Sequence, residues 1–297
     1  MIIVSLIGGL GNQMFQYALG RRLALKNKVD LKFDICELRK DPIIGTPRKY
    51  NLHCFNILEK FATPQEIQKY KGDNPGLLLK LIRIILGGTT ANRNKSFIVE
   101  KENFVFDKDV LQVDKNAYLQ GYWQNEKYFR NIRDVLLEEF TVKHPPDKKN
   151  QDVLNQTNST NSVSIHVRRG DYVKDKRTNK HHGTCSLGYY KKAIEIIAKK
   201  IKNPYFFAFS DDIAWVKKNL QMKYPVYCVD NNNDEHNYED LRLMSACKHN
   251  IIANSSFSWW GAWLNKNPNK IVIAPKKWLN NSDIDTSDVT PKEWLRM

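Results

Sequence analysis

The sequence has neither paired cysteines nor a long apolar run. Its five cysteines are odd in number, widely spaced and without a C-x-x-C pair; they are Cys36, Cys54, Cys185, Cys228 and Cys247. This usage is typical of reduced thiols in a cytosolic protein and argues against a disulfide framework or a zinc site. No segment reaches the roughly 20 apolar residues of a membrane-spanning helix, so we expect a cytoplasmic protein.

The nearest approach to such a run is GLLLKLIRIILGG (76–88), which has ten residues between its glycines and contains Lys80 and Arg83. As a helix it would be basic and amphipathic. We expect it to pack on its own domain, and peripheral contact with the anionic inner surface of a membrane is the alternative. The N-terminal stretch MIIVSLIGGLGNQ has no basic residue, so we expect no secretory signal.

Several catalytic signatures are also missing. The chain has no G-x-x-x-x-G-K-[ST], H-E-x-x-H or G-x-S-x-G motif, which argues against a P-loop NTPase, a zinc protease and an α/β-hydrolase. The D-x-D pattern occurs only as DKD (107–109) and DID (283–285), in irregular stretches. We therefore expect no metal ion and no cofactor to take part in the chemistry.

The charge balance is strongly basic. The chain has 297 residues, 41% hydrophobic and 27% charged, with a formal net charge of +15 and a pI of about 9.4. A basic excess favours anionic partners such as nucleic acid, a phospholipid surface or phosphorylated small molecules, or it belongs to a lysine-rich solvated surface. Because the basic residues are scattered over both halves, we expect no nucleic-acid partner.

The length allows one large domain or two of ordinary size. A polar stretch at 143–162 contains Pro145 and Pro146 and has no sustained apolar period, so it predicts a boundary. We expect one domain over 1–145 and a second over 160–297.

Both halves predict alternating strands and helices. In the second, five short apolar runs alternate with four helical patterns, such as YYKKAIEIIAKKI (189–201). The first half begins in the same way and ends with a strand, AYLQGYW (117–123), and one long helix, EKYFRNIRDVLLEEF (126–140). Such alternation implies parallel sheets with right-handed crossovers. The predicted class is α/β, with two Rossmann-like domains facing across a cleft and ligands beyond the carboxyl ends of the strands.

The motif GGLGNQ (8–13) lies between a predicted strand and helix. Gly9 and Gly11 fit two positions of the dinucleotide fingerprint, but Met14 occupies the third glycine's place. A nicotinamide-dependent oxidoreductase and a tight structural turn are therefore both alternatives. Asn12 and Gln13 offer two amides where a helix start needs one capping side chain, which favours contact with a ligand.

The motif HVRRGDY (166–172) follows a predicted buried strand. The planar fork of arginine binds phosphate oxygens bidentately. On an extended backbone Arg168 and Arg169 point in opposite directions, so one can face a ligand while the other braces the loop or pairs with Asp171. His166 lies on the same side as Arg168. The alternative is a surface cluster of ion pairs.

Two further motifs follow predicted strands. In FSDD (209–212), Asp211 and Asp212 could accept hydrogen bonds from ribose or guanine, or Ser210 or Asp211 could cap a helix. NSSFSWWGAWL begins at Asn254 and offers hydroxyl and helix N–H groups to a phosphate. We expect most of its tryptophans in the core, and the candidate contacts are Asn254, Ser255, Ser256, Phe257 and Ser258.

These motifs, together with GYWQ (121–124) and HGTCSLGYY (182–190), resemble in this order the bacterial α-1,2-fucosyltransferases of glycosyltransferase family 11. The resemblance runs from residue 2 to about residue 278. HVRRGD is shared with α-1,6- and protein-O-fucosyltransferases, whereas SSFSWWGAWL favours the α-1,2 group. The segment at about 40–115 matches weakly, and we expect it to determine the acceptor.

The resemblance implies a two-domain fold of the GT-B type. It also implies inverting, metal-independent transfer of L-fucose from GDP-fucose to the 2-hydroxyl of a terminal galactose in an oligosaccharide or surface glycan such as an O-antigen. The first domain would take the acceptor and the second the GDP-fucose. Other GDP-fucose-dependent transferases, of the α-1,6 or protein-O type, are the alternative.

Residue roles carried over by position follow from the same resemblance. Arg168 or Arg169 would stabilise the departing β-phosphate. His166, with Asp211 or Asp212, would contact guanine and ribose. Ser255, Ser256 and the backbone near Phe257 would hold the pyrophosphate, and Asn12 with its loop would close the cleft.

A general base is needed only late in such a dissociative reaction. We nominate Asp171 as this base, and it could instead orient an arginine. The alternatives are His181, His182, Asp175 and Glu239.

Overall fold

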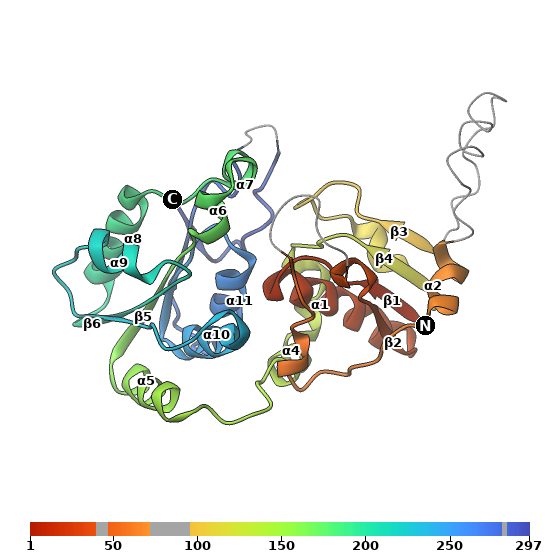
Figure 1. Cartoon of the computed structure of the whole chain (residues 1–297), viewed down its shortest axis with the longest axis horizontal. Coiled ribbons are helices and arrows are strands. Elements are labelled where there is room, and N and C mark those ends of the chain that lie inside the picture. The colour runs from red at the N-terminus through yellow and green to blue at the C-terminus, as the bar shows by residue number, and fades with distance from the viewer. Residues whose placement is uncertain (40–46, 72–95, 281–283) are drawn as a thin grey trace. The chain divides into compact units, whose positions relative to one another are not determined.

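The computed structural model describes residues 1–39, 47–71, 96–280 and 284–297 (Figure 1). The chain divides into two compact units. Apart from short pieces between residues 47 and 56, the first unit runs to Leu136 and the second from Leu137 to the C-terminus. The basic amphipathic stretch 76–88 lies outside the described residues.

The first unit is a parallel sheet with the strand order β2-β1-β4-β3. The sheet and its helices are β1 (Ile2–Ser5), α1 (Leu10–Asn27), β2 (Leu31–Asp34), α2 (Pro64–Lys71), β3 (Phe97–Val99) and β4 (Ala117–Gln120). Short 3-10 helices fill the connections at Cys36–Arg39, Leu52–Cys54, Lys108–Gln112, Glu126–Tyr128 and Arg130–Ile132.

The second unit is a larger parallel sheet with the order β10-β9-β8-β5-β6-β7. Its strands are β5 (Asn161–Val167), β6 (Pro204–Ser210), β7 (Val226–Cys228), β8 (His249–Ile251), β9 (Val272–Ala274) and β10 (Leu295–Arg296). Its helices are α5 (Lys148–Ser159), α6 (Gly170–Lys174), α7 (Lys176–His182), α8 (Leu187–Lys200), α9 (Ile213–Asn219), α10 (Asn237–Ala246) and α11 (Ser256–Leu264), with a 3-10 turn at Asp234–His236, and α4 (Arg133–Glu139) crosses the boundary between the units. The predicted α/β class with two Rossmann-like sheets is confirmed.

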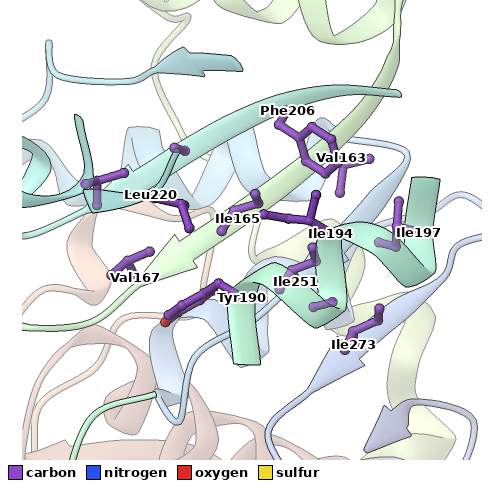
Figure 2. Packing of buried hydrophobic residues seen from close by; sticks show 13 residues of the cluster. Val163, Ile165, Val167, Tyr190, Ile194, Ile197, Phe206, Leu220, Ile251 and Ile273 are labelled. Atoms are coloured by element: carbon purple, nitrogen blue, oxygen red, sulfur yellow. The ribbon is translucent and has the colours of Figure 1, made fainter. Parts of the chain in front are cut away.

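The core of the second unit surrounds its central strand β5. Figure 2 shows Tyr190, Ile194 and Ile197 of α8 packed beside Val163 and Ile165 of β5. These α8 residues recur at helical spacing, so that one face of the helix is buried while the lysines face solvent. The helical pattern predicted from the sequence is confirmed.

The strand order changes direction at β5, which lies between β8 and β6. From β5 the chain proceeds through β6 to β7, and then returns to β8 and continues to β9. Because parallel crossovers are right-handed, α8 and α9 cover one face of the sheet and α10 and α11 the other. The carboxyl ends of β5 and β8 therefore form the topological switch point, where such sheets bind ligands.

The elements expected from the sequence differ from the structure in three places. The long helix expected at 126–140 is broken into two 3-10 turns and α4. The strands β3 and β10, of three and two residues, were missed. Twelve of the twenty residues of the polar stretch expected to form a boundary belong to helix α5, which begins where the Asp147 side chain accepts the Asn150 N–H. Its buried face is Asn150, Val153 and Thr157, so a search for apolar periodicity could not detect it.

Replacing Ile165 by Ala should destabilise the second unit. Ile165 is fully buried in the central strand, and truncating such a side chain to Ala costs about 2–5 kcal/mol of unfolding free energy. Urea denaturation should show this loss, whereas Lys199→Ala on the exposed side of α8 should stay within about 0.5 kcal/mol of the wild type. An equal effect of both substitutions would contradict this packing.

Candidate functional site

Two arginine–aspartate pairs extend the pairing of β5 with β6 beyond the ends of the strands. Nη1 of Arg168 lies 2.9 Å from Oδ2 of Asp211, and Nε of Arg169 lies 3.2 Å from Oδ2 of Asp212. The backbone N–H of Arg169 also donates to Oδ1 of Asp211, at 2.8 Å. Adjacent residues at the end of one strand therefore bind adjacent residues at the end of the next.

The turn after β6 is fixed by its own hydrogen bonds. The Ser210 hydroxyl donates to the carbonyl of Val167 at 2.7 Å and accepts the N–H of Asp212 at 3.0 Å. Asp212 is the N-cap of α9, since its Oδ1 accepts the N–H of Trp215 at 3.2 Å. The sequence left a cap from Ser210 or Asp211 as the alternative to ligand contact, and the residue that caps α9 is Asp212.

Gly170 allows the loop after β5 to approach Asp211 closely. A Cβ atom at this position would lie 2.4 Å from Oδ2 of Asp211. Any larger residue would therefore displace the carboxylate that pairs with Arg168.

Both guanidinium groups lie over aromatic rings. Arg169 lies 3.9 Å from the ring centroid of Trp215, and Arg168 lies 5.2 Å from that of Tyr172. Tyr172 in turn stacks on His182, with ring centroids 4.7 Å apart. The sequence analysis did not name Trp215, because it lies after the aspartates in a segment with the pattern of an ordinary amphipathic helix. The one signal in the sequence is the position of this large aromatic side chain, one helical turn after the aspartate pair.

His166 is buried at the end of β5, with 4% of its surface exposed. Its ring lies 5.8 Å from that of Phe257 in the first turn of α11. Within the described part of the chain, its Nδ1 atom has no hydrogen-bond partner. Burial, helped by the nearby Arg168 charge, lowers the pKa of His166 to about 3. The imidazole is therefore neutral at physiological pH, and contact of the buried Nδ1 with a ligand stays a prediction.

The N-terminus of α11 lies directly after the end of β8. Ser255 is the N-cap residue, but its side chain makes no capping hydrogen bond. The first turn of a helix has N–H groups without partners inside the helix, and the helix dipole favours an anion there. Ser255, Ser256 and Phe257 are thus placed where the sequence predicted a phosphate.

Asn254 and Ser258 have internal hydrogen bonds. The Asn254 amide donates to the carbonyls of His182, Gly183 and Trp278 at 3.0–3.3 Å. The Ser258 hydroxyl donates to the Ser255 carbonyl at 3.3 Å. These contacts make both side chains supports of the site, whereas the sequence suggested direct ligand contact. As expected, the tryptophans of this motif belong to the core, with Trp259, Trp260 and Trp263 at most 2% exposed.

The glycine-rich motif of the first unit differs from its predicted form. Helix α1 begins at Leu10, so Gly11, Asn12 and Gln13 lie in its first turn and not in a loop. Gly8 has a positive φ of 75°, but Gly9 is the extended N-cap.

The two amides of this motif make hydrogen bonds within the first unit. Gln13 is fully buried, and its amide donates to the carbonyls of Gly8 and Lys49. Asn12 is half-buried, and its Oδ1 accepts a bond from Gln124 at 2.8 Å. Gln13 therefore has a structural role, and Asn12 remains the better candidate for ligand contact.

The candidate bases have different surroundings. The side chain of Asp171 lies outside the described residues. Asp175 caps α7 by accepting the Thr178 N–H at 2.7 Å, and this bond lowers its pKa. Glu239 is buried beside Arg242, 2.9 Å away, and burial raises its pKa. His181 is exposed.

Two features are absent from the residues that the structure describes. No group of three or more His, Cys, Asp or Glu residues in them is placed to hold a metal ion. No helix in the same ranges is long and apolar enough to span a membrane.

Comparison with known proteins gives extensive matches. A model of glycosyl transferase family 11 matches residues 97–297. An Escherichia coli O-antigen biosynthesis glycosyltransferase, WbnK, is 33% identical over 98% of this chain and 99% of its own. An Escherichia coli α-1,2-colitosyltransferase is 34% identical over 100% of this chain and 99% of its own. Bovine (Bos taurus) galactoside 2-α-L-fucosyltransferase SEC1 is 28% identical over 49% of this chain and 41% of its own.

The low pKa of His166 predicts a specific dependence of stability on pH. As the pH falls below about 6.5, the unfolded chain binds a proton at this histidine and the folded chain does not. Stability should therefore fall with decreasing pH, by about 1.4 kcal/mol per pH unit from this group. His166→Phe removes this contribution, so urea denaturation between about pH 6 and pH 4 should show a shallower slope for the variant. Parallel slopes for the two proteins would contradict the buried, neutral imidazole.

Proposed function

The chain belongs to glycosyltransferase family 11, and we propose that it transfers L-fucose from GDP-fucose to the 2-hydroxyl group of a terminal galactose. The observation that carries the proposal is the pair of arginines at the carboxyl end of β5, each bound to its own aspartate. They lie beside the topological switch point and the N-terminus of α11, where an anion is favoured. The names of the bovine and bacterial relatives support an α-1,2 linkage.

The proposed chemistry inverts the anomeric carbon of the sugar. The acceptor hydroxyl attacks from the face opposite GDP, the bond from C1 to the β-phosphate oxygen breaks, and the hydroxyl proton leaves late. Negative charge then develops on the departing diphosphate, and preorganised cations stabilise this charge more than that of the bound substrate. With arginine and helix N–H groups in this role, no metal ion is required. Asp171 is our proposed proton acceptor.

We assign the phosphate contact to Arg168. It lies two residues after His166, and its charge lowers the pKa of that histidine, so the two groups lie near each other. His166 packs against α11, whereas Arg169 packs against Trp215 of α9, and these helices cover opposite faces of the sheet. Arg168 is therefore the arginine on the side of the α11 N-terminus.

A second donor has specific support. The relative with 34% identity over the whole chain is named an α-1,2-colitosyltransferase. Colitose is fucose without its 3-hydroxyl group, so one donor site could bind both sugars.

We place the reaction in the cytoplasm, on glycans assembled at the inner face of a membrane.

Donor choice can be measured directly. The purified chain should release GDP from GDP-fucose in the presence of lactose, and NMR of the product should show a fucose on galactose O2. In excess EDTA, the rate should stay within about twofold of the rate without EDTA. If GDP-colitose is the faster donor, the proposed donor GDP-fucose is wrong and GDP-colitose takes its place. A loss of activity in EDTA that Mg²⁺ restores would contradict the metal-free mechanism.

The two arginines should differ in their effect on turnover. Arg168→Ala should lower kcat by about 10²–10³, the loss typical of removing one group that stabilises transition-state charge. Arg169→Ala should lower kcat by a smaller factor. Arg177 is an exposed arginine of α7, and Arg177→Ala should keep the wild-type rate. A loss below tenfold for Arg168→Ala would contradict its assignment to the phosphate.

A further inference from the structure

Arg169 is held by three contacts within the second unit. Its Nε lies 3.2 Å from Oδ2 of Asp212, its guanidinium carbon lies 3.9 Å from the ring centroid of Trp215, and its backbone N–H donates to Asp211. Only 19% of its side-chain surface is exposed. Together these contacts fix both the backbone and the charged end of one residue.

The side-chain contacts restrict different motions. Stacking on the indole face limits tilting of the guanidinium plane, because the attraction is strongest with the cation over the ring. The bond from Nε to Asp212 limits rotation within that plane. Among the described residues, no hydrogen bond ends on Nη1 or Nη2 of Arg169, so its orientation depends on Asp212 and Trp215.

Asp212 connects these contacts to α9. One carboxylate oxygen accepts the N–H of Trp215, and the other pairs with Arg169. The same carboxylate therefore orients the helix turn that carries the indole and the cation that stacks on it.

We infer that Trp215 is a positioning residue for the transfer reaction and acts through Arg169. This inference rests on the function proposed above. With the indole in place, Arg169 fastens the loop after β5 to α9, and the loop carries Arg168 beside its partner Asp211. Without the indole, Arg169 can tilt away from Asp212, and Arg168 loses part of the alignment that phosphate stabilisation requires.

The test uses a series of substitutions at two positions. Trp215→Leu should lower kcat about three- to thirty-fold, the range that corresponds to a cation–π contact. Trp215→Phe keeps an aromatic face and should retain at least a third of the wild-type kcat. Arg169→Ala combined with Trp215→Leu should be no slower than Arg169→Ala alone, because an indole that acts through Arg169 has no effect once that arginine is absent.

A structural readout separates this contact from general destabilisation. The ring current of Trp215 should shift the NMR resonance of the Arg169 Nε–H group, and Trp215→Leu should move it strongly while Trp215→Phe moves it less. Simple loss of folded protein would instead lower kcat equally in the Arg169→Ala background.

Three kinetic results would overturn the inference: a wild-type kcat for Trp215→Leu, an equal loss of kcat in Trp215→Phe and Trp215→Leu, or additive losses in the double variant. An Arg169 resonance unaffected by Trp215→Leu would do so independently of turnover. Absence of GDP release by the wild-type chain with every GDP-sugar would overturn the proposed function, and the positioning role with it, while the resonance would still report the contact itself.

Discussion

The site depends on the pairing of two adjacent arginines with two adjacent aspartates at the ends of neighbouring parallel strands. These side chains are partly exposed, with 18–39% of their surface accessible, and ion pairs of this kind add little to stability. Their consequence is geometric. The register of β5 and β6 brings the residues together, Ser210 fixes the turn that carries the aspartates, and the aspartates orient the guanidinium groups.

Burial and charge are distributed unequally around these pairs. His166 is neutral because it is buried, so it adds no charge to the site. The positive potential comes from arginine and from the first turn of α11. Asn254 binds the backbone at the end of α7, which joins the element carrying His182 to the end of β8. The site is thus a set of fixed dipoles and cations supported by buried amides.

The sequence predicted the elements whose apolar residues are strongly periodic. The prediction failed where the buried face of an element is polar. Strand β5 and helix α8 were predicted because their apolar residues follow the periods of a strand and a helix. Helix α5 was missed because its buried face contains Asn150 and Thr157.

The residues of the candidate site could be named from the sequence, but their partners could not. Nothing in HVRRGD or FSDD indicates that each arginine pairs with an aspartate, that Asp212 caps α9, or that Trp215 lies under Arg169, because these contacts depend on the register between two strands 43 residues apart.

We propose above all that a sugar diphosphate binds at the carboxyl ends of β5 and β8. A crystal structure with GDP tests it most directly: we expect the β-phosphate about 3 Å from Arg168 and from the first-turn N–H groups of α11, and a nucleotide bound away from both would contradict the account.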